Sequence, residues 1–99
     1  MQNELDPVSF ARRIRRHALV MTAKAKASHI GSCLSAADIV AVLYTRILQI
    51  DPANPDDPLR DRFVLSKGHA AAILYAALAE RGFFDAKLLD DFCAAGSAL

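Results

Sequence analysis

The sequence predicts an incomplete α/β fold, mostly helical and with about one strand. Residues 63–65 (Phe-Val-Leu) form the one convincing strand pattern, and helical patterns lie on both sides of it. That order is typical of a parallel sheet, but a lone parallel strand has no hydrogen-bonding neighbours. The predicted helices over residues 36–48 and 70–79 are also apolar on nearly all sides, as in helices buried inside larger proteins. More of this polypeptide or a partner must therefore supply the remaining strands.

Length and composition limit the classes of function that the chain can have. The 99 residues suit one small domain. Because 54% of them are hydrophobic, the composition is typical of a folded rather than an intrinsically disordered chain. A net charge of +1 gives no reason to expect a nucleic-acid or acidic-membrane partner. The longest charge-free run, residues 68–79, is shorter than the roughly 18 residues of a membrane span. Glu4 and Asp6 stand where a signal peptide would be basic, and Cys33 and Cys93 fit neither a metal-site spacing nor a disulfide framework. We therefore expect a reduced cytoplasmic protein.

The first predicted helix has a clear start. Asp6 can cap its free amides, Pro7 suits the first helical position, and Leu5 can pack against Phe10. The helix should end near Ala27. Its predicted buried face consists of Phe10, Ile14, Ala18, Met21 and Ala25.

A short loop, residues 28–33, should lead into a second helix that ends at about Leu48. Ser35 and Asp38 form a start signal for this helix, with Leu34 and Ile39 as its hydrophobic staple. Residues 51–62 contain three prolines and predict an irregular loop.

The strand at residues 63–65 should turn into a third helix through residues 66–68. That helix should end around Arg81, with Gly82 as its stop. Asp85 is expected to cap a fourth helix that runs through Leu88, Leu89 and Phe92.

His69 is the strongest candidate for ligand binding on position alone. It follows Gly68 at the junction of strand and helix, where free amides and the helix dipole favour an anion. Gly68 lets a ligand approach the backbone closely, and open α/β sheets bind ligands beyond their strand ends. Spacing alone slightly favours a plain capping or packing role, because strand–glycine–helix turns are common.

The other two histidines differ in context. His29 lies among small residues in a loop, which suits a substrate contact, although an ordinary surface histidine is the better reading from spacing alone. His17 lies near the apolar face of the first helix and is expected to be structural, hydrogen-bonded at the edge of the core.

The remaining constellations favour structural roles. Asp56-Asp57 lies in a proline-rich turn, so no metal site is expected. Cys33 should be a small buried residue. The first helix carries four arginines, Arg12, Arg13, Arg15 and Arg16. They could bind phosphate, but a solvated helix face is the favoured interpretation.

Two segments of the chain resemble the transketolase family. The first is Ser28-His29-Ile30-Gly31-Ser32-Cys33-Leu34-Ser35-Ala36-Ala37-Asp38-Ile39. The second is similar to the family's D-R-F-x-L-S-x-G-H-A signature and reads Asp61-Arg62-Phe63-Val64-Leu65-Ser66-Lys67-Gly68-His69-Ala70. The resemblance extends from about Arg13 through Phe84 and is strongest to the N-terminal subunits of transketolases split between two polypeptides. Residues 1–99 then form the N-terminal portion of a thiamine-diphosphate-binding domain.

The resemblance implies roles for both matched histidines. His69 would contact the cofactor's diphosphate beside Gly68 and line the substrate channel, and His29 would contact the sugar and support proton transfers. The implied cofactors are thiamine diphosphate and Mg²⁺. The family's metal-binding G-D-G…N motif has no counterpart here, so the metal ligands would lie outside this chain. Ile30 also replaces the proline of the common G-H-P-G form.

The implied reaction transfers a two-carbon ketol unit between sugar phosphates. The implied partners are the rest of the N-terminal domain and a C-terminal pyrimidine-binding subunit in an oligomer, and the isolated chain should be inactive. One rival is an enzyme similar to deoxyxylulose-phosphate synthase. The other is a non-catalytic remnant that only docks onto a partner subunit.

Overall fold

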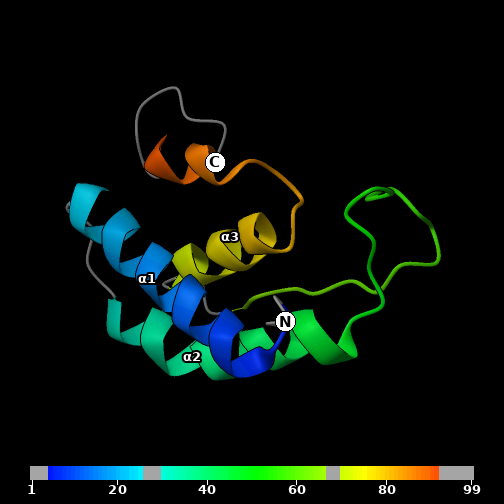
Figure 1. The fold of residues 1–99 in the computed structure, drawn as a ribbon, viewed down its shortest axis with the longest axis horizontal. Coiled ribbons are helices and arrows are strands. Elements are labelled where there is room, and N and C mark those ends of the chain that lie inside the picture. Colours follow the sequence, from blue (N-terminus) through cyan, green and yellow to red (C-terminus); the bar gives the residue numbers. More distant parts are fainter. Residues whose placement is uncertain (1–4, 26–29, 67–69, 92–99) are drawn as a thin grey trace.

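Three α-helices pack against one another in the computed structural model, which describes residues 5–25, 30–66 and 70–91 (Figure 1). Helix α1 contacts both α2 and α3, and α2 also contacts α3. The short element η3 packs on α3 and α1. The elements are α1 (Pro7–Ala25), α2 (Ile30–Val42), the π-helical turn η1 (Leu43–Ile47), α3 (Ala71–Glu80) and the 3₁₀ element η3 (Ala86–Asp91).

Helix α1 begins as its sequence predicts. Asp6 caps it, because the backbone amide of Ser9 donates to Asp6 Oδ2 at 3.1 Å. Phe10, Ile14 and Ala18 on the predicted stripe are fully buried. The helix is described as far as Ala25, and its predicted end near Ala27 lies outside the described residues.

The predicted start of the second helix is wrong. Helix α2 begins at Ile30, so Ser35 lies inside the helix instead of capping it, and Ile39 is 66% exposed instead of stapling a helix start. Cys33 is buried in the core, and this tertiary packing outweighs the local start signal. After Val42 the helix widens into η1, and Leu48 is extended, so the predicted end near Leu48 is confirmed.

The predicted strand is also wrong: no strand occurs within residues 5–25, 30–66 and 70–91. Residues 61–66 carry no regular secondary structure, although their burial alternates as in a strand. Phe63 and Leu65 pack on the core, whereas Val64 is 84% exposed. A strand needs a neighbour to complete its hydrogen-bond ladder, and the described residues provide none.

The predicted stop of α3 is confirmed. Gly82 has φ +93°, a left-handed conformation that glycine adopts without a Cβ penalty. The Gly82 amide donates to the Ala79 carbonyl and the Phe83 amide to the Leu78 carbonyl, each at 3.0 Å. These two bonds form a Schellman motif, which satisfies carbonyls at the helix end.

The segment after α3 is 3₁₀-helical within its described residues. As predicted, Asp85 caps it: Asp85 Oδ1 accepts from the Lys87 amide at 2.9 Å. The predicted helical position Phe92 lies outside the described residues.

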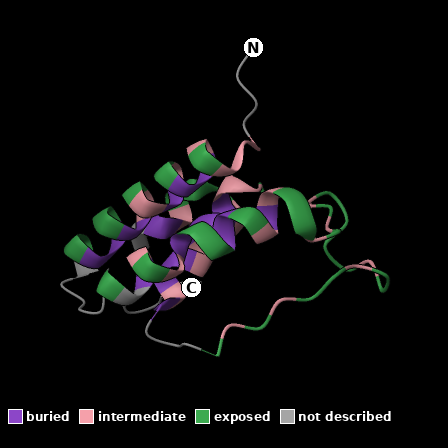
Figure 2. Ribbon diagram, turned by 90° about the horizontal axis from the view of Figure 1, so that it is seen from below, coloured by how far each residue is buried: buried purple, intermediate pink, exposed green. Residues whose placement is uncertain are grey.

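The core lies where the three helices meet, and the exposed side chains cover the outer faces (Figure 2). Small buried residues of α3 let the helices approach closely: Ala72, Ala76 and Ala77. The segment formed by α2 and η1 is apolar on nearly all sides, a pattern that predicts burial only inside a larger protein, and Ile39 of α2 and Ile47 of η1 are indeed exposed. The described residues therefore leave one side of this helical segment without a packing partner.

Candidate functional site

The residues predicted to contact ligands, His29, Gly68 and His69, lie outside the described residues. Their chain neighbours are described. His29 immediately precedes Ile30, the first residue of α2. His69 immediately precedes Ala70, the N-cap residue of α3. Each histidine is thus adjacent in sequence to the start of a helix that belongs to the core.

The N-terminus of α3 lacks one common stabilising contact. Its N-cap residue Ala70 is fully buried and provides no side-chain hydrogen bond. A Ser, Asp or Asn at such a position would accept a bond from a first-turn amide. The N-cap side chain therefore satisfies no amide at this helix start, a position with positive electrostatic potential.

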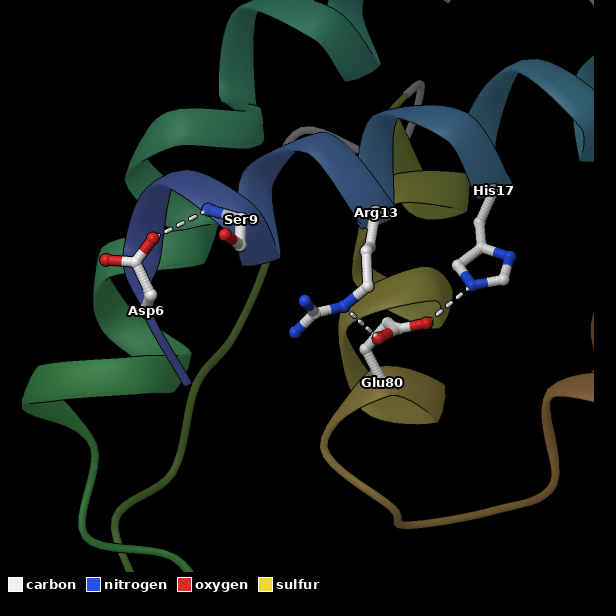
Figure 3. A network of polar contacts seen from close by, with 5 residues as sticks. All are labelled: Asp6, Ser9, Arg13, His17 and Glu80. Carbon is white, nitrogen blue, oxygen red and sulfur yellow. Dashed lines mark hydrogen bonds and ion pairs between the residues drawn. The ribbon is translucent and has the colours of Figure 1, made fainter. Parts of the chain in front are cut away.

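Three charged or polar side chains join α1 to α3 (Figure 3). Arg13 Nε donates to Glu80 Oε1 at 2.6 Å, and His17 Nε2 donates to Glu80 Oε2 at 2.7 Å. Arg13 and His17 lie one helical turn apart, so both reach the same carboxylate. The Arg13 guanidinium also lies 5.6 Å from the ring centroid of Phe10. The prediction of a structural, hydrogen-bonded His17 is confirmed.

Glu80 is ionised more readily than an ordinary glutamate. Burial of its side chain raises the pKa, but the hydrogen bonds and charges of His17 and Arg13 outweigh burial, and the pKa is lowered. The carboxylate is thus a fixed negative charge between two helices. Its partners in sequence are 63 and 67 residues away, so no local spacing could have identified it.

A cavity of about 690 Å³ opens beside these contacts, and we name it the cationic cleft. Arg12 and Arg16 contribute two exposed guanidinium groups from one side of α1. The reading of the four arginines as a solvated face is therefore only partly confirmed, since Arg13 bonds to Glu80 and Arg15 lies 2.9 Å from Asp38. The lining residues are Ser9, Arg12, Arg13, Arg16, His17 and Glu80.

A smaller cavity of about 190 Å³ lies between η1, the long loop and α3. The rings of Tyr44 and Phe63 meet there edge to face, with centroids 5.9 Å apart, and burial raises the pKa of Tyr44. Arg60 Nε is buried and forms no hydrogen bond with any described residue. The two rings pack at the edge of the core.

Two further predictions of structural roles are confirmed. Cys33 is a buried core residue, and Asp57 stabilises a turn by accepting from the Leu59 amide at 2.9 Å. Across the described ranges, no group of three or more His, Cys, Asp or Glu side chains could hold a metal ion. No helix in the described part of the chain is long and apolar enough to span a membrane.

Comparison with known proteins finds one family. The sequence model of the transketolase thiamine diphosphate binding domain matches residues 8–97. A 6-deoxy-6-sulfo-D-fructose transketolase subunit of Clostridium sp. is 43% identical over 98 residues, covering 99% of this chain and 36% of the relative. Human transketolase is 48% identical over 81 residues, covering 81% of this chain and 13% of the enzyme.

A third relative is an apulose-4-phosphate transketolase subunit of Phocaeicola vulgatus. It is 39% identical over 85 residues, which cover 86% of this chain and 30% of the relative. The chain therefore spans about a third or less of the length of these relatives, two of which are subunits.

Proposed function

This chain belongs to the transketolase family, in its thiamine-diphosphate-binding domain, and from that premise we propose that it forms the N-terminal part of a transketolase-like transferase. The reaction is transfer of a two-carbon ketol unit between sugar phosphates. The observation that carries the proposal is the family match over residues 8–97, which includes both motif segments.

His69 and Gly68 are proposed to bind the diphosphate of the cofactor. They immediately precede α3, whose N-cap residue Ala70 offers no side-chain acceptor to the first-turn amides. Free amides, the helix dipole and an imidazole donor are a chemically suitable set for a diphosphate. The described surroundings of these residues therefore fit the cofactor.

His29 is proposed as the catalytic histidine that contacts the sugar and helps to move protons. It is joined directly to Ile30 at the start of α2, whose Cys33 and Ala37 are buried in the core. A neutral imidazole can accept or donate a proton near neutral pH, which suits this role. His69 is proposed to line the same substrate channel.

The cofactors of this proposal are thiamine diphosphate and Mg²⁺. Thiamine diphosphate supplies the carbanion chemistry, and the protein binds and orients the reactants. The sequence has no counterpart of the family's G-D-G…N motif, so the proposal assigns the metal ligands to polypeptide outside these 99 residues. The partners would be the rest of the N-terminal domain and a pyrimidine-binding subunit. Two relatives are themselves named as transketolase subunits, which supports this division.

Histidine variants test the assignment in a chimera where these 99 residues replace the matching segment of the Phocaeicola relative, assayed with its companion subunit. His69→Ala should weaken thiamine diphosphate binding by about tenfold or more, because it removes a charge-assisted hydrogen bond. His29→Ala should lower kcat and leave the cofactor Kd within about twofold. His17→Gln is the control, since His17 contacts Glu80 in the structure.

The cofactor Kd and kcat should both be nearly unchanged in the His17→Gln control. Cofactor affinity and turnover that stay at the parent level in both His69→Ala and His29→Ala would refute the site assignment.

A further inference from the structure

We propose that the cationic cleft between α1 and α3 is a second ligand site, which binds the phosphate groups of a small phosphorylated molecule. Its volume of about 690 Å³ lies within the usual range of small-molecule sites, about 300–1,000 Å³. Unlike most such sites, it is lined mainly by charged and polar side chains, which suit a charged ligand.

The balance of charge in the cleft favours an anion. Among the described residues that line it, three are arginines and one, Glu80, carries a carboxylate. That carboxylate is already engaged, because Arg13 and His17 each bond to one of its oxygens. Glu80 therefore neutralises the positions next to it and leaves the charges of Arg12 and Arg16 uncompensated.

Arg12 and Arg16 form the proposed contact. They lie four residues apart on α1, so their side chains project from the same face at a spacing of about 6 Å. Both are exposed, and neither forms an ion pair or hydrogen bond with another described residue. Two like charges at this spacing destabilise a helix slightly, and a bound anion removes that repulsion.

Phosphate is the anion whose shape best fits these groups. The planar guanidinium group presents paired N–H donors that match two oxygens of a phosphate, and two such groups one turn apart can hold one phosphate or a diphosphate. Because both arginines are exposed, we expect a dissociation constant on the order of 1 mM for inorganic phosphate. Binding should weaken as salt rises.

The site is separate from the proposed reaction, since it uses none of His29, Gly68 and His69. If the cleft binds no phosphate, the proposed transferase function still stands. If the transferase function is refuted, the proposed phosphate site still stands. The test is titration of the 99-residue chain with inorganic phosphate and then with pyrophosphate. Binding is monitored through the NMR chemical shifts of the backbone amides, at low and at high salt.

Three variants accompany the unmodified chain. Arg12→Gln with Arg16→Gln removes the proposed contact, and Arg12→Lys with Arg16→Lys keeps the charge but loses the paired donors. Arg62→Gln with Lys87→Gln is the matched control, because it removes two exposed positive charges that do not line the cleft. Circular dichroism should show the same helix content for all four proteins.

The site is supported if the amides of residues 9–17 show saturable shifts in the unmodified chain. The affinity obtained from these shifts should fall at least about tenfold in the glutamine pair and severalfold in the lysine pair, and it should not change in the control. Pyrophosphate should bind more tightly than phosphate. Shifts of equal size in the glutamine pair and the control would overturn the proposal, and so would a complete lack of saturable shifts in the unmodified chain.

Discussion

Glu80 is the residue on which the polar contacts between α1 and α3 converge, and its loss should be measurable. Glu80→Gln should lower the free energy of unfolding by about 1–2 kcal/mol at pH 7, because it weakens two charge-assisted hydrogen bonds. The Glu80 side chain is only 19% exposed, whereas its partners are about a third exposed, which limits the effect. Urea denaturation provides the measurement.

The same variant tests the pKa of Glu80. The folded pKa is lower than its ordinary value of 4.5, so this stabilisation is fully present above pH 4.5 and is lost as pH falls through the folded pKa. Stability of Glu80→Gln should therefore fall less than that of the parent between pH 7 and about pH 3. Asp38→Asn is the control, because Asp38 is 76% exposed and should contribute little. Parallel pH curves for the parent and Glu80→Gln would contradict the account.

Residue roles were predictable where they depend on local context. The position of His17 beside the apolar stripe of α1 predicts a structural role, and its bond to Glu80 confirms this. Glu80 itself carries no local signal, because its importance arises only when α3 packs against α1. The roles of His29 and His69 stay predictions.

At the scale of elements, two glycines should respond in opposite ways to the same substitution. Gly82→Ala should cost about 1–2 kcal/mol, because Gly82 has φ +93° at the end of α3. Gly31→Ala should stabilise by up to about 1 kcal/mol, since Gly31 lies within α2 and an added Cβ would meet no atom of the described residues within 4 Å.

Thermal or urea unfolding of the two variants tests this pair in one experiment. Two shifts in the same direction would show that one of these backbone environments is wrongly described. Gly31 also lies in the first family motif. If Gly31→Ala raises the stability of the chimera but lowers its turnover, the loss of turnover cannot come from unfolding.

The elements also show which structural signals are local. The start of α1 at Asp6 and the end of α3 at Gly82 were predictable, because capping depends on a few neighbouring residues. The start of α2 was not, because burial of Cys33 extends that helix beyond its local signal. The predicted strand at residues 63–65 was not, because its residue types suit a strand but a strand forms only beside neighbouring strands, which the described residues do not supply.

At the scale of the molecule, the exposed apolar residues predict self-association. Ile39 and Ile47 are more than half exposed, and Val42 between them is also exposed. Exposed apolar surface of this kind favours association. Light scattering should show species larger than the monomer, and Ile39→Lys with Ile47→Lys should shift the distribution towards the monomer. Leu59→Lys is the control, since Leu59 is exposed in the long loop. A uniform monomer of the unmodified chain would contradict this expectation.

These exposed faces agree with the length comparison. The chain spans 36% of the Clostridium relative, and the alternating burial of residues 61–66 is what a strand without its sheet would retain. The absence of a sheet from the described residues is therefore consistent with the predicted incomplete α/β domain. An incomplete domain stays a prediction from the lone strand pattern, whereas the exposed apolar face became visible only from the packing of the three helices.

Ketol transfer tests the central claim most directly. The isolated 99-residue chain and its chimera with the Phocaeicola relative, assayed with the companion subunit, would each receive a ketose phosphate donor, an aldose phosphate acceptor, thiamine diphosphate and Mg²⁺. We predict that the chimera forms the transferred sugar phosphate and the isolated chain forms none. Robust turnover by the isolated chain would contradict the account, and so would a folded, cofactor-loaded chimera that transfers no two-carbon unit.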